Sequence, residues 1–252
     1  HRAWFRFRGK RRARDRNLFW ELKEVISNIK NLPQKTKYQY TIQNITNRFE
    51  MVKWIEYICT ILNISDEAFF TTVEIYDEVL KKFCYNLSND DFLLIGLTCI
   101  FISCKLYDGK TINIEFLLKT IAHGKFEKDD LLMTEILILK TLGFKMPRNY
   151  FSSYVNIILG IILPKGDCLI SNHIYRNIMN VYKKIFYDVK FEKYDLLSIY
   201  TSLVYYEITK LGISSNFDLN SVVEKMARAV KMYRVSWKRS MLIANILEQC
   251  RL

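Results

Sequence analysis

Two apolar segments of this sequence resemble each other, and they limit the possible folds more than any other feature. FLLIGLTCIFISCKL begins at Phe92 and YDLLSIYTSLVYYEI begins at Tyr194, 102 residues later, and each has a charged residue next to its end, Lys105 or Glu207. A helix that is apolar on every side must be surrounded by other helices. The first segment therefore predicts the central helix of a bundle, and the second predicts a repeat of that arrangement.

Signals for helix starts and ends around these segments predict five helices before Pro147 and five after it. Ser65 and Ser88 are good N-caps, and Gly143 suits the left-handed position that ends a helix. The predicted fold class is all-α, with tandem five-helix repeats and an additional N-terminal helix. In the first repeat the expected helices cover residues 44–62, a stretch from 65 onward, 92–105, 113–122 and 127–143.

The repeat and the composition together predict the domain boundaries. A short amphipathic helix at 18–30 is followed by a break at Leu32 and Pro33, and a linker at 144–148 separates the two repeats. We expect a basic tail or an added leader at 1–17, the N-terminal helix with its linker at 18–43, a first repeat at 44–146 and a second repeat at 147–252.

The net charge of +12 is concentrated at the start of the chain. The first 16 residues hold eight Lys or Arg and one Asp, which leaves +5 for the remainder. Two interpretations are open: a tail for nuclear import or nucleic-acid contact, or a solvated leader that is foreign to the protein. The sequence does not begin with Met, so we expect a fragment or a processed chain.

The composition argues against a membrane protein, a disulfide-linked protein and an enzyme. The longest apolar run ends at Lys105 and is too short to span a bilayer, so we expect a protein of the nucleus, the cytoplasm or both. The three histidines show no triad or metal-ligand spacing, and we expect no catalytic residue, no metal and no cofactor. The six cysteines, expected to be reduced core residues, are Cys59, Cys84, Cys99, Cys104, Cys168 and Cys250.

One carboxylate interrupts the apolar face of a predicted helix. Glu135 lies three or four residues from four apolar side chains of LLMTEILILKTL and shares their face. An unpaired carboxylate there would cost several kcal/mol, so it needs a cation or amide donors. Lys105 is the natural candidate, because it ends the central helix, where its charge also suits the helix dipole. Two alternatives are open: an internal ion pair, or a binding site.

Five spaced residues carry a specific resemblance. Arg48, Asp77, Leu94, Lys105 and Glu135 have the order and spacing of the signature residues of the cyclin box, and NRFEMVKWIEYI, LLIGLTCIFISCKLYD and TEILILKTLGF resemble its helices. The resemblance covers residues 44–144 strongly and the second repeat through its helix pattern. It implies a cyclin, a non-catalytic regulatory subunit that activates a cyclin-dependent serine/threonine kinase by positioning its αC helix and activation loop.

The resemblance also implies roles for single residues. Arg48 and Asp77 match the pair that ties the first two helices of the box together, and Leu94 and Trp54 match structural positions. The other two signature residues match those that hydrogen-bond the kinase, which favours the binding-site alternative. The positions implied to bind the kinase are Lys105, Glu135, Ile102, Leu106, Leu139 and Phe144.

The patch with which cyclins recruit Arg-x-Leu substrates is only partly present. Asn47 and Glu50 stand where Met and Ile are usual, and Tyr57 replaces an acidic residue, whereas Met51 and Trp54 match the pattern. We therefore expect kinase activation without the usual docking of such substrates.

The implied partner is a cyclin-dependent kinase catalytic subunit, with a third assembly subunit as an option, and the subtype stays open between cyclin H-like and mitotic types. The alternative is a TFIIB-like cyclin-fold transcription factor that binds DNA or the transcription machinery. It needs a basic face on the folded part, for which the candidates are the lysines of 23–37 with Lys81, Lys82, Lys183 and Lys184. Because the five signature residues fit kinase binding, we expect nucleic-acid contact only through the basic tail.

Overall fold

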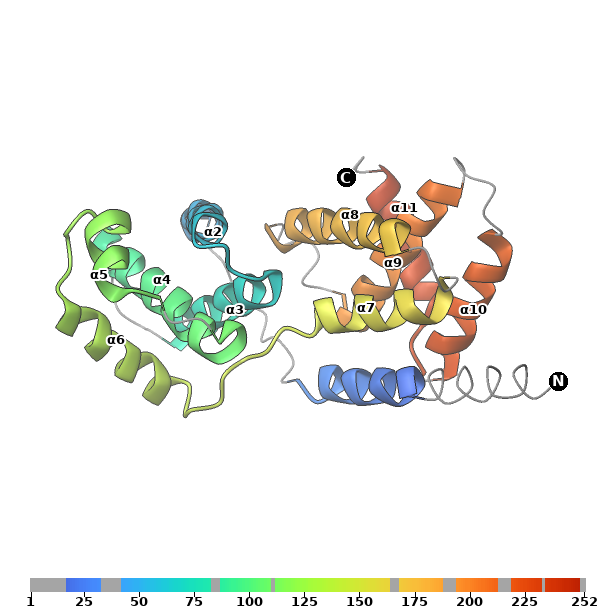
Figure 1. The fold of residues 1–252 in the computed structure, drawn as a ribbon, viewed down its shortest axis with the longest axis horizontal. Coiled ribbons are helices and arrows are strands. Elements are labelled where there is room, and N and C mark those ends of the chain that lie inside the picture. Colours follow the sequence, from blue (N-terminus) through green and yellow to red (C-terminus); the bar gives the residue numbers. More distant parts are fainter. Residues whose placement is uncertain are drawn as a thin grey trace. The chain divides into compact units, whose positions relative to one another are not determined.

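The structure is a computed structural model that describes residues 17–32, 42–82, 87–109, 112–163, 168–187, 194–212, 219–232 and 234–249 (Figure 1). All regular elements within these ranges are helices, which confirms the predicted all-α fold class. The chain divides into two compact units, one of residues 37–149 and one that combines residues 1–36 with 150–252. The basic segment at residues 1–16 lies outside the described ranges.

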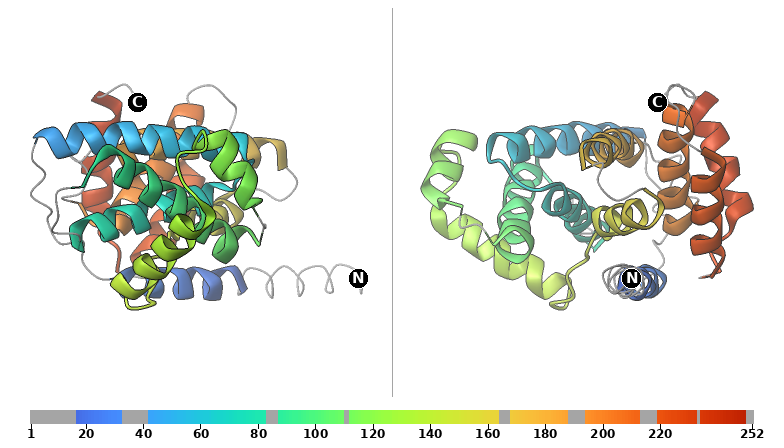
Figure 2. Two further views of the ribbon diagram at one scale, coloured as in Figure 1. Left: turned by 90° about the vertical axis from the view of Figure 1, so that its left-hand side faces the viewer. Right: turned by 45° about the vertical axis from the view of Figure 1, so that its right-hand side comes forward.

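The first unit is built around one buried helix. Its elements are α2 (Ile42–Ile61), α3 (Asp66–Lys82), α4 (Asn89–Ser103), α5 (Ile114–Phe116) and α6 (Lys128–Thr141), with two π-helical turns, η1 (Cys104–Asp108) and η2 (Leu117–Ile121). Helix α4 contacts α2, α3 and α6, and α2 lies across the same side of α3 and α4 in Figures 1 and 2. All nine residues from Ile95 to Ser103 are buried, as a helix that is apolar on every side requires.

Side-chain caps start the helices where the sequence predicts them. The Ser88 hydroxyl accepts a hydrogen bond from the Asp91 amide at 3.2 Å, and the Asp91 carboxylate accepts one from the Ser88 amide at 2.8 Å. These two bonds form a capping box at the start of α4. The Ser65 hydroxyl caps α3 by accepting from the Ala68 amide at 3.2 Å. After α6, Gly143 has a φ of 60°, the left-handed conformation that the sequence predicts there.

A buried ion pair joins α2 to α3. The Arg48 guanidinium donates two hydrogen bonds to the Asp77 carboxylate, Nε to Oδ1 and Nη2 to Oδ2, both at 2.8 Å. The two side chains are 6% and 9% exposed, so water and salt screen the pair little. Burial, and after it the charge of Asp77, raise the pKa of the Cys99 thiol in α4, which therefore stays protonated. Cys99, Cys59 and Cys104 are buried, as predicted, and the other three cysteines lie outside the described side chains.

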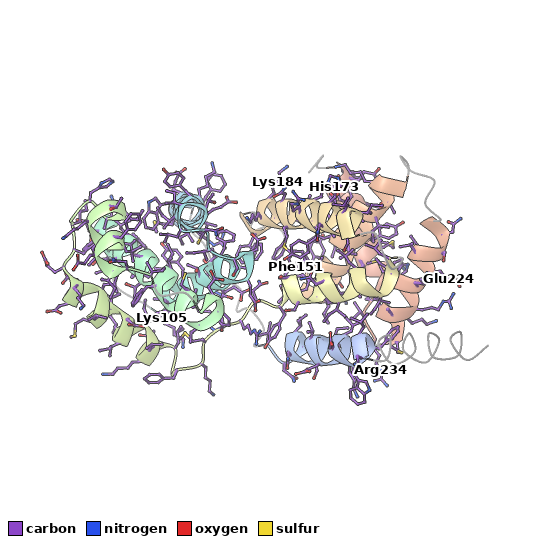
Figure 3. All side chains as sticks on the ribbon, viewed as in Figure 1. Lys105, Phe151, His173, Lys184, Glu224 and Arg234 are labelled. Carbon is purple, nitrogen blue, oxygen red and sulfur yellow. The ribbon has the colours of Figure 1, made fainter. Side chains whose placement is uncertain are left out.

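The second unit repeats this arrangement around another central helix. Its elements include α7 (Phe151–Ile162), α8 (Cys168–Tyr187), α9 (Leu196–Gly212), α10 (Leu219–Met232) and α11 (Trp237–Gln249). Helix α9 contacts each of the other four, so the segment that begins at Tyr194 forms the central helix that its apolar pattern predicts. Aromatic rings fill the space between α7, α8 and α9: the Phe151 ring centroid lies 4.8 Å from that of Tyr200, which lies 5.6 Å from that of Tyr182 (Figure 3).

The N-terminal helix, residues 17–30, belongs to the second unit although it precedes the first in the chain. Its buried side chains are Leu22, Ile26 and Ile29, which lie on the predicted apolar stripe. Leu18 packs against α7 at Gly160, where a Cβ atom would lie 3.5 Å from the Leu18 Cδ1. This distance is an ordinary van der Waals contact, so the packing of the two helices would also accommodate an alanine at this position.

A buried carboxylate lies near the end of α9. Glu207 is 2% exposed and occupies the position that Lys105 has in the first repeat, 102 residues earlier. It accepts a hydrogen bond from Asn177 of α8, whose amide nitrogen lies 3.3 Å from the His173 ring (Figure 3). Burial raises the pKa of Glu207, and this effect outweighs the lowering of the pKa by Lys210, Asn177 and His173.

We expect Asp77→Asn to lower the free energy of unfolding by about 3–5 kcal/mol, because it removes the charge that compensates the buried Arg48 guanidinium. Urea denaturation followed by circular dichroism measures this change. Asp90→Asn is the matched control, since Asp90 pairs with Lys125 at side chains that are 62% and 53% exposed. This exposed pair should contribute about 1 kcal/mol or less. Equal losses in the two variants would contradict the role given to the buried pair.

Glu207→Gln should raise the stability at neutral pH, because Gln can still accept the hydrogen bond from Asn177 but carries no buried charge. The sign follows from the raised pKa of Glu207. As the pH rises from about 4, the unfolded state releases this proton before the folded state does, so the native chain loses stability. The advantage of the variant should therefore shrink as the pH falls toward about 4, which urea unfolding across this pH range measures. If the higher stability of the variant does not change with pH, the charge of the Glu207 carboxylate is not its cause.

Candidate protein-interaction surface

A π-helical turn extends the central helix α4 and carries Lys105. The turn η1 continues α4 and ends at Gly109, which has a φ of 59°. The sequence predicts Lys105 at the end of the α-helix, whereas the structure places it in this wider turn, a geometry often found at functional sites. Ser103 and Cys104 are buried, and the Lys105 side chain is 38% exposed. Lys105 is therefore the point at which the buried segment reaches solvent.

Lys105, which Figure 3 labels, pairs with Glu135 of α6. The Lys105 ammonium donates to the Glu135 carboxylate and also lies 4.1 Å from the ring centroid of Phe101, a cation–π contact. The Glu135 side chain is 14% exposed, less than half the exposure of Lys105. The pair is thus satisfied within the chain and is also accessible from outside, so this geometry is compatible with an internal pair and with a binding site.

The apolar positions that the resemblance implies divide into exposed and buried ones. Leu106 directly follows Lys105 and is 52% exposed, and Phe144 is 69% exposed. Leu139 of α6 is half-buried. Ile102 is the exception, because it is 1% exposed in the core around α4. Ile102 therefore supports the position of η1 and does not offer a contact to a partner on this surface.

The outer face of α6 carries exposed apolar side chains that were not among the predicted site residues. Met133, Ile136 and Leu137 are 68%, 47% and 49% exposed. They lie at i, i+3 and i+4 and share one face, while Leu131 and Ile138 fill the opposite, buried face. The signal was present in LLMTEILILKTL, which is apolar over more of its circumference than one core-facing stripe needs. We call these three residues the outer α6 face.

Phe144 and the chain that follows it are held by specific contacts. Phe144 has a φ of 59°, an unfavourable conformation for a residue other than glycine. The Tyr107 hydroxyl of η1 donates to the Pro147 carbonyl at 3.1 Å, and the Asn149 side-chain amide donates to the buried Glu74 carboxylate at 3.0 Å. The last residues of the first unit are thus fastened to η1 and α3.

Two structural positions implied by the resemblance pack in the core of the first unit. Helix α2 approaches α4 at Gly96, where a Cβ atom would lie 2.6 Å from the Met51 Cε and 3.4 Å from the Trp54 Cζ3. Met51 and Trp54 are therefore half-buried packing residues. Leu94 and Trp54 pack against a buried cluster of Leu97, Phe101, Leu117, Leu118, Ala122 and Leu131.

The other described positions of the substrate-docking patch face solvent. Glu50 is exposed, and Tyr57 is 63% exposed. Beside them, the Lys53 ammonium lies 4.2 Å from the ring centroid of Phe49. The exposed face of α2 thus mixes charged and aromatic side chains. The side chain of Asn47 lies outside the described ones.

The described residues form neither a metal site nor a membrane span. Among them, no three His, Cys, Asp or Glu side chains are grouped as a metal ion would require. None of the helices in these ranges is both long and apolar enough to cross a membrane. The candidate surface consists of one charged pair and of exposed apolar side chains, a combination that suits contact with another protein.

Comparison with known families and curated proteins gives consistent matches. A family model described as "Cyclin, N-terminal domain" matches residues 17–147, just over half of the 252 residues. The chain is 28% identical over 166 residues to the G1/S-specific cyclins CLN2 and CLN3 of Candida albicans, covering 62% of this chain. It is 25% identical over 115 residues to Cyclin-O protein A of Xenopus laevis, covering 44% of this chain. These matches span 32%, 32% and 31% of the relatives, about a third of their length.

Solved structures share the fold at low sequence identity. A viral cyclin from herpesvirus saimiri superimposes with a TM-score of 0.64 and 16% identity, covering 84% of this chain and 94% of the viral one. A chain of the CAK complex of Chaetomium thermophilum bound to ATP-γ-S gives a TM-score of 0.51 and 12% identity, covering 94% and 80%. At these identities the likeness shows the fold alone.

A double-mutant cycle on the unfolding free energy tests how far the Lys105–Glu135 pair is internal. We expect Lys105→Ala and Glu135→Ala to show a coupling energy of about 1 kcal/mol or less, because the Lys105 side chain is 38% exposed. Urea denaturation of the two single variants and the double variant gives this value. A coupling of about 3 kcal/mol or more would place the pair with buried, structural ion pairs.

Proposed function

The chain belongs to the cyclin family, and from this membership we propose that it is a regulatory subunit that binds and activates a cyclin-dependent protein kinase. The proposal assigns no catalytic residue to the chain, since the kinase supplies the chemistry. The observation that carries it is the accessible Lys105–Glu135 pair, which lies on two elements that also bear exposed apolar side chains.

The charged pair provides one donor and one acceptor for a partner helix. In the free chain the two groups satisfy each other. The carbonyl groups at the end of a partner helix can accept from Lys105, and backbone amides near that helix can donate to Glu135. The Lys105 ammonium lies at the end of a flexible, partly exposed side chain. Rotation of this side chain can therefore move the ammonium from Glu135 to an acceptor on the partner.

Exposed apolar side chains on the same elements provide contact area. Leu106 follows Lys105 in η1, Phe144 follows α6, and both are more than half exposed. The outer α6 face lies on the side of α6 opposite Leu131 and Ile138, whereas Glu135 shares their side, so the outer face is not counted in this contact area. Groups of exposed apolar side chains mark protein-binding sites. In such a site a few residues contribute most of the binding energy. Phe144 also keeps an unfavourable backbone conformation, which persists only where the surrounding structure fixes it.

The rigidity of this surface explains how binding would activate a kinase. An active kinase needs its αC helix swung inward, so that the αC Glu pairs with the β3 Lys, and an ordered activation loop. A surface that fits αC in this position favours the active state by binding it better than the inactive one. The buried core around α4 and the contacts at residues 147–149 hold the surface in one geometry.

We assign the partner to the kinases of the cell cycle. Two curated relatives are G1/S-specific cyclins, and they match the segment that contains the candidate surface. Recruitment of Arg-x-Leu substrates through α2 is not part of the proposal. The Leu of such a motif would contact the exposed Glu50, where the family has Ile. Tyr57, which is also exposed, replaces an acidic residue of the family pattern.

Lys105→Ala and Glu135→Ala should each weaken kinase binding by about 2 kcal/mol, roughly 30-fold in Kd, as truncation of a central interface residue does. The kinase is first recovered from a native extract with the tagged full chain and identified by mass spectrometry. Calorimetric titration of the purified kinase then gives the Kd of each variant.

Glu115→Ala and Lys119→Ala are the matched controls for charge and residue type. These two residues form an exposed pair at 3.7 Å in the same unit, with side chains 79% and 78% exposed, and we expect both variants to bind the kinase as the native chain does. The proposal is wrong if no protein kinase co-purifies, or if the folded Lys105→Ala and Glu135→Ala variants keep the native Kd.

A further inference from the structure

The end of α10, the turn after it and the start of α11 form a strongly basic surface on the second unit. No Asp or Glu occurs between residues 225 and 239. All of its basic side chains are exposed. Figure 3 labels Glu224, just before this stretch, and Arg234, in the turn between the helices. The basic side chains, which we call the α10–α11 corner, are Lys225, Arg228, Lys231, Arg234, Lys238 and Arg239.

Four of the six corner cations have no acidic partner among the described residues. Arg228 pairs with Glu224 at 2.8 Å, one helical turn earlier, and Arg239 lies 3.6 Å from Asp195. The four remaining cations, Lys225, Lys231, Arg234 and Lys238, form no ion pair within the described ranges. Exposed like charges at such density repel one another. This arrangement costs stability, which an anionic partner would restore.

The charges at the start of α11 oppose what helix stability favours. The first turn of a helix is the positive end of its dipole and favours acidic residues. Helices α3, α4 and α6 have two acidic residues each in the first turn, whereas α2, α7, α8, α9 and α10 have none. The first turn of α11 has none and carries Lys238 and Arg239 instead. The Ser236 hydroxyl accepts a hydrogen bond from the Arg239 amide at 3.4 Å, and the two cations present positive charge to solvent at this end of the helix.

The arginine content of the corner is also unusual for this chain. Outside the first 16 residues the sequence has seven arginines against 23 lysines, and three of those seven lie between 228 and 239. Arg48 pairs with Asp77 and Arg148 with Glu67 in the first unit. Within the corner, Arg228 and Arg239 also contact carboxylates, which leaves Arg234 as the corner arginine without an acidic partner in the described ranges. Arg234 has a φ of 57°, a left-handed conformation that glycine adopts at lower energetic cost. Arginine is the side chain best suited to bind phosphate oxygens.

We propose that the α10–α11 corner binds the phosphate backbone of a nucleic-acid duplex. Its unpaired cations do not converge on one point, because Lys225 and Lys231 are about 9 Å apart along α10 and Lys238 lies on the next helix. A single phosphate on a peptide would engage only part of this set. A duplex presents a negative charge about every 1.7 Å along its axis and can engage all of it.

This inference goes beyond the proposed kinase-regulating function and uses the other unit of the chain. It also differs from the expectation that only the basic tail contacts nucleic acid. Of the lysines first considered for a basic face, Lys81 donates to Glu78 and Lys82 donates to the Thr141 carbonyl, so both are engaged within the first unit.

The test measures the binding of the full chain to a short fluorescent duplex, as DNA and as RNA, by anisotropy at salt concentrations from about 50 to 200 mM. The corner variant combines Lys225→Gln, Lys231→Gln, Arg234→Gln and Lys238→Gln. Each lost phosphate contact lowers the slope of log affinity against log salt by about 0.9. We expect the slope to fall by about 2 to 4 and the affinity at about 0.1 M salt to fall at least about ten-fold.

The control variant removes the same charge from the first unit through Lys53→Gln, Lys119→Gln, Lys125→Gln and Lys128→Gln. It should keep most of the native slope and affinity, and a chain that lacks residues 1–16 should still bind the duplex through the corner. The corner variant should bind the kinase with native affinity. Such a result would show that kinase binding and duplex binding use different surfaces, so that either proposal can fail without the other.

Three outcomes would overturn the inference. The first is an equal loss of duplex affinity in both quadruple variants, which would show that only the net charge of the chain matters. The second is complete loss of binding on removal of residues 1–16, which would assign the contact to the tail. The third is a chain that binds neither duplex but binds a phosphorylated peptide through the corner. Binding of either duplex with the predicted loss in the corner variant supports it, and the tighter duplex identifies the nucleic acid.

Discussion

The burial of α4 on all sides is the constraint on which the first unit depends. Nine consecutive residues of this helix must be covered, so α2, α3 and α6 pack around it, and the Arg48–Asp77 pair joins two of these helices with its charges compensated. The buried segment ends at Cys104, and the next residue, Lys105, lies where α6 can supply a carboxylate. The position of the candidate surface therefore follows from where the apolar segment stops.

Sequence patterns predicted those parts of the structure that depend on local chemistry. The cap at Ser88, the left-handed Gly143 and the central position of the two apolar helices follow from side-chain type and spacing. The change from α to π geometry at η1 could not be predicted in this way, because it depends on hydrogen bonds that composition does not encode. The burial of Ile102 and the exposure of the outer α6 face depend on which neighbours cover each side of a helix, and the pattern of one helix does not contain that information.

The two repeats share a scaffold and differ in chemistry at the end of the central helix. In the first unit this position is Lys105, which pairs with Glu135 near the surface. In the second unit the matching residue is Glu207, which is buried against Asn177 of α8 and has a raised pKa. The sequence alone shows both residues as charges after an apolar run, so only the packing of α6 or α8 around them separates a surface pair from a buried carboxylate.

The close approach of α2 to α4 at Gly96 separates two kinds of position on the exposed side of α2. Met51 and Trp54 pack over that glycine, so the core alone requires side chains of their size and polarity. Glu50 and Tyr57 face solvent on the same helix, and core packing places no such requirement on them. Packing therefore accounts for the two residues that match the docking pattern, and their presence is no argument that the chain docks Arg-x-Leu substrates.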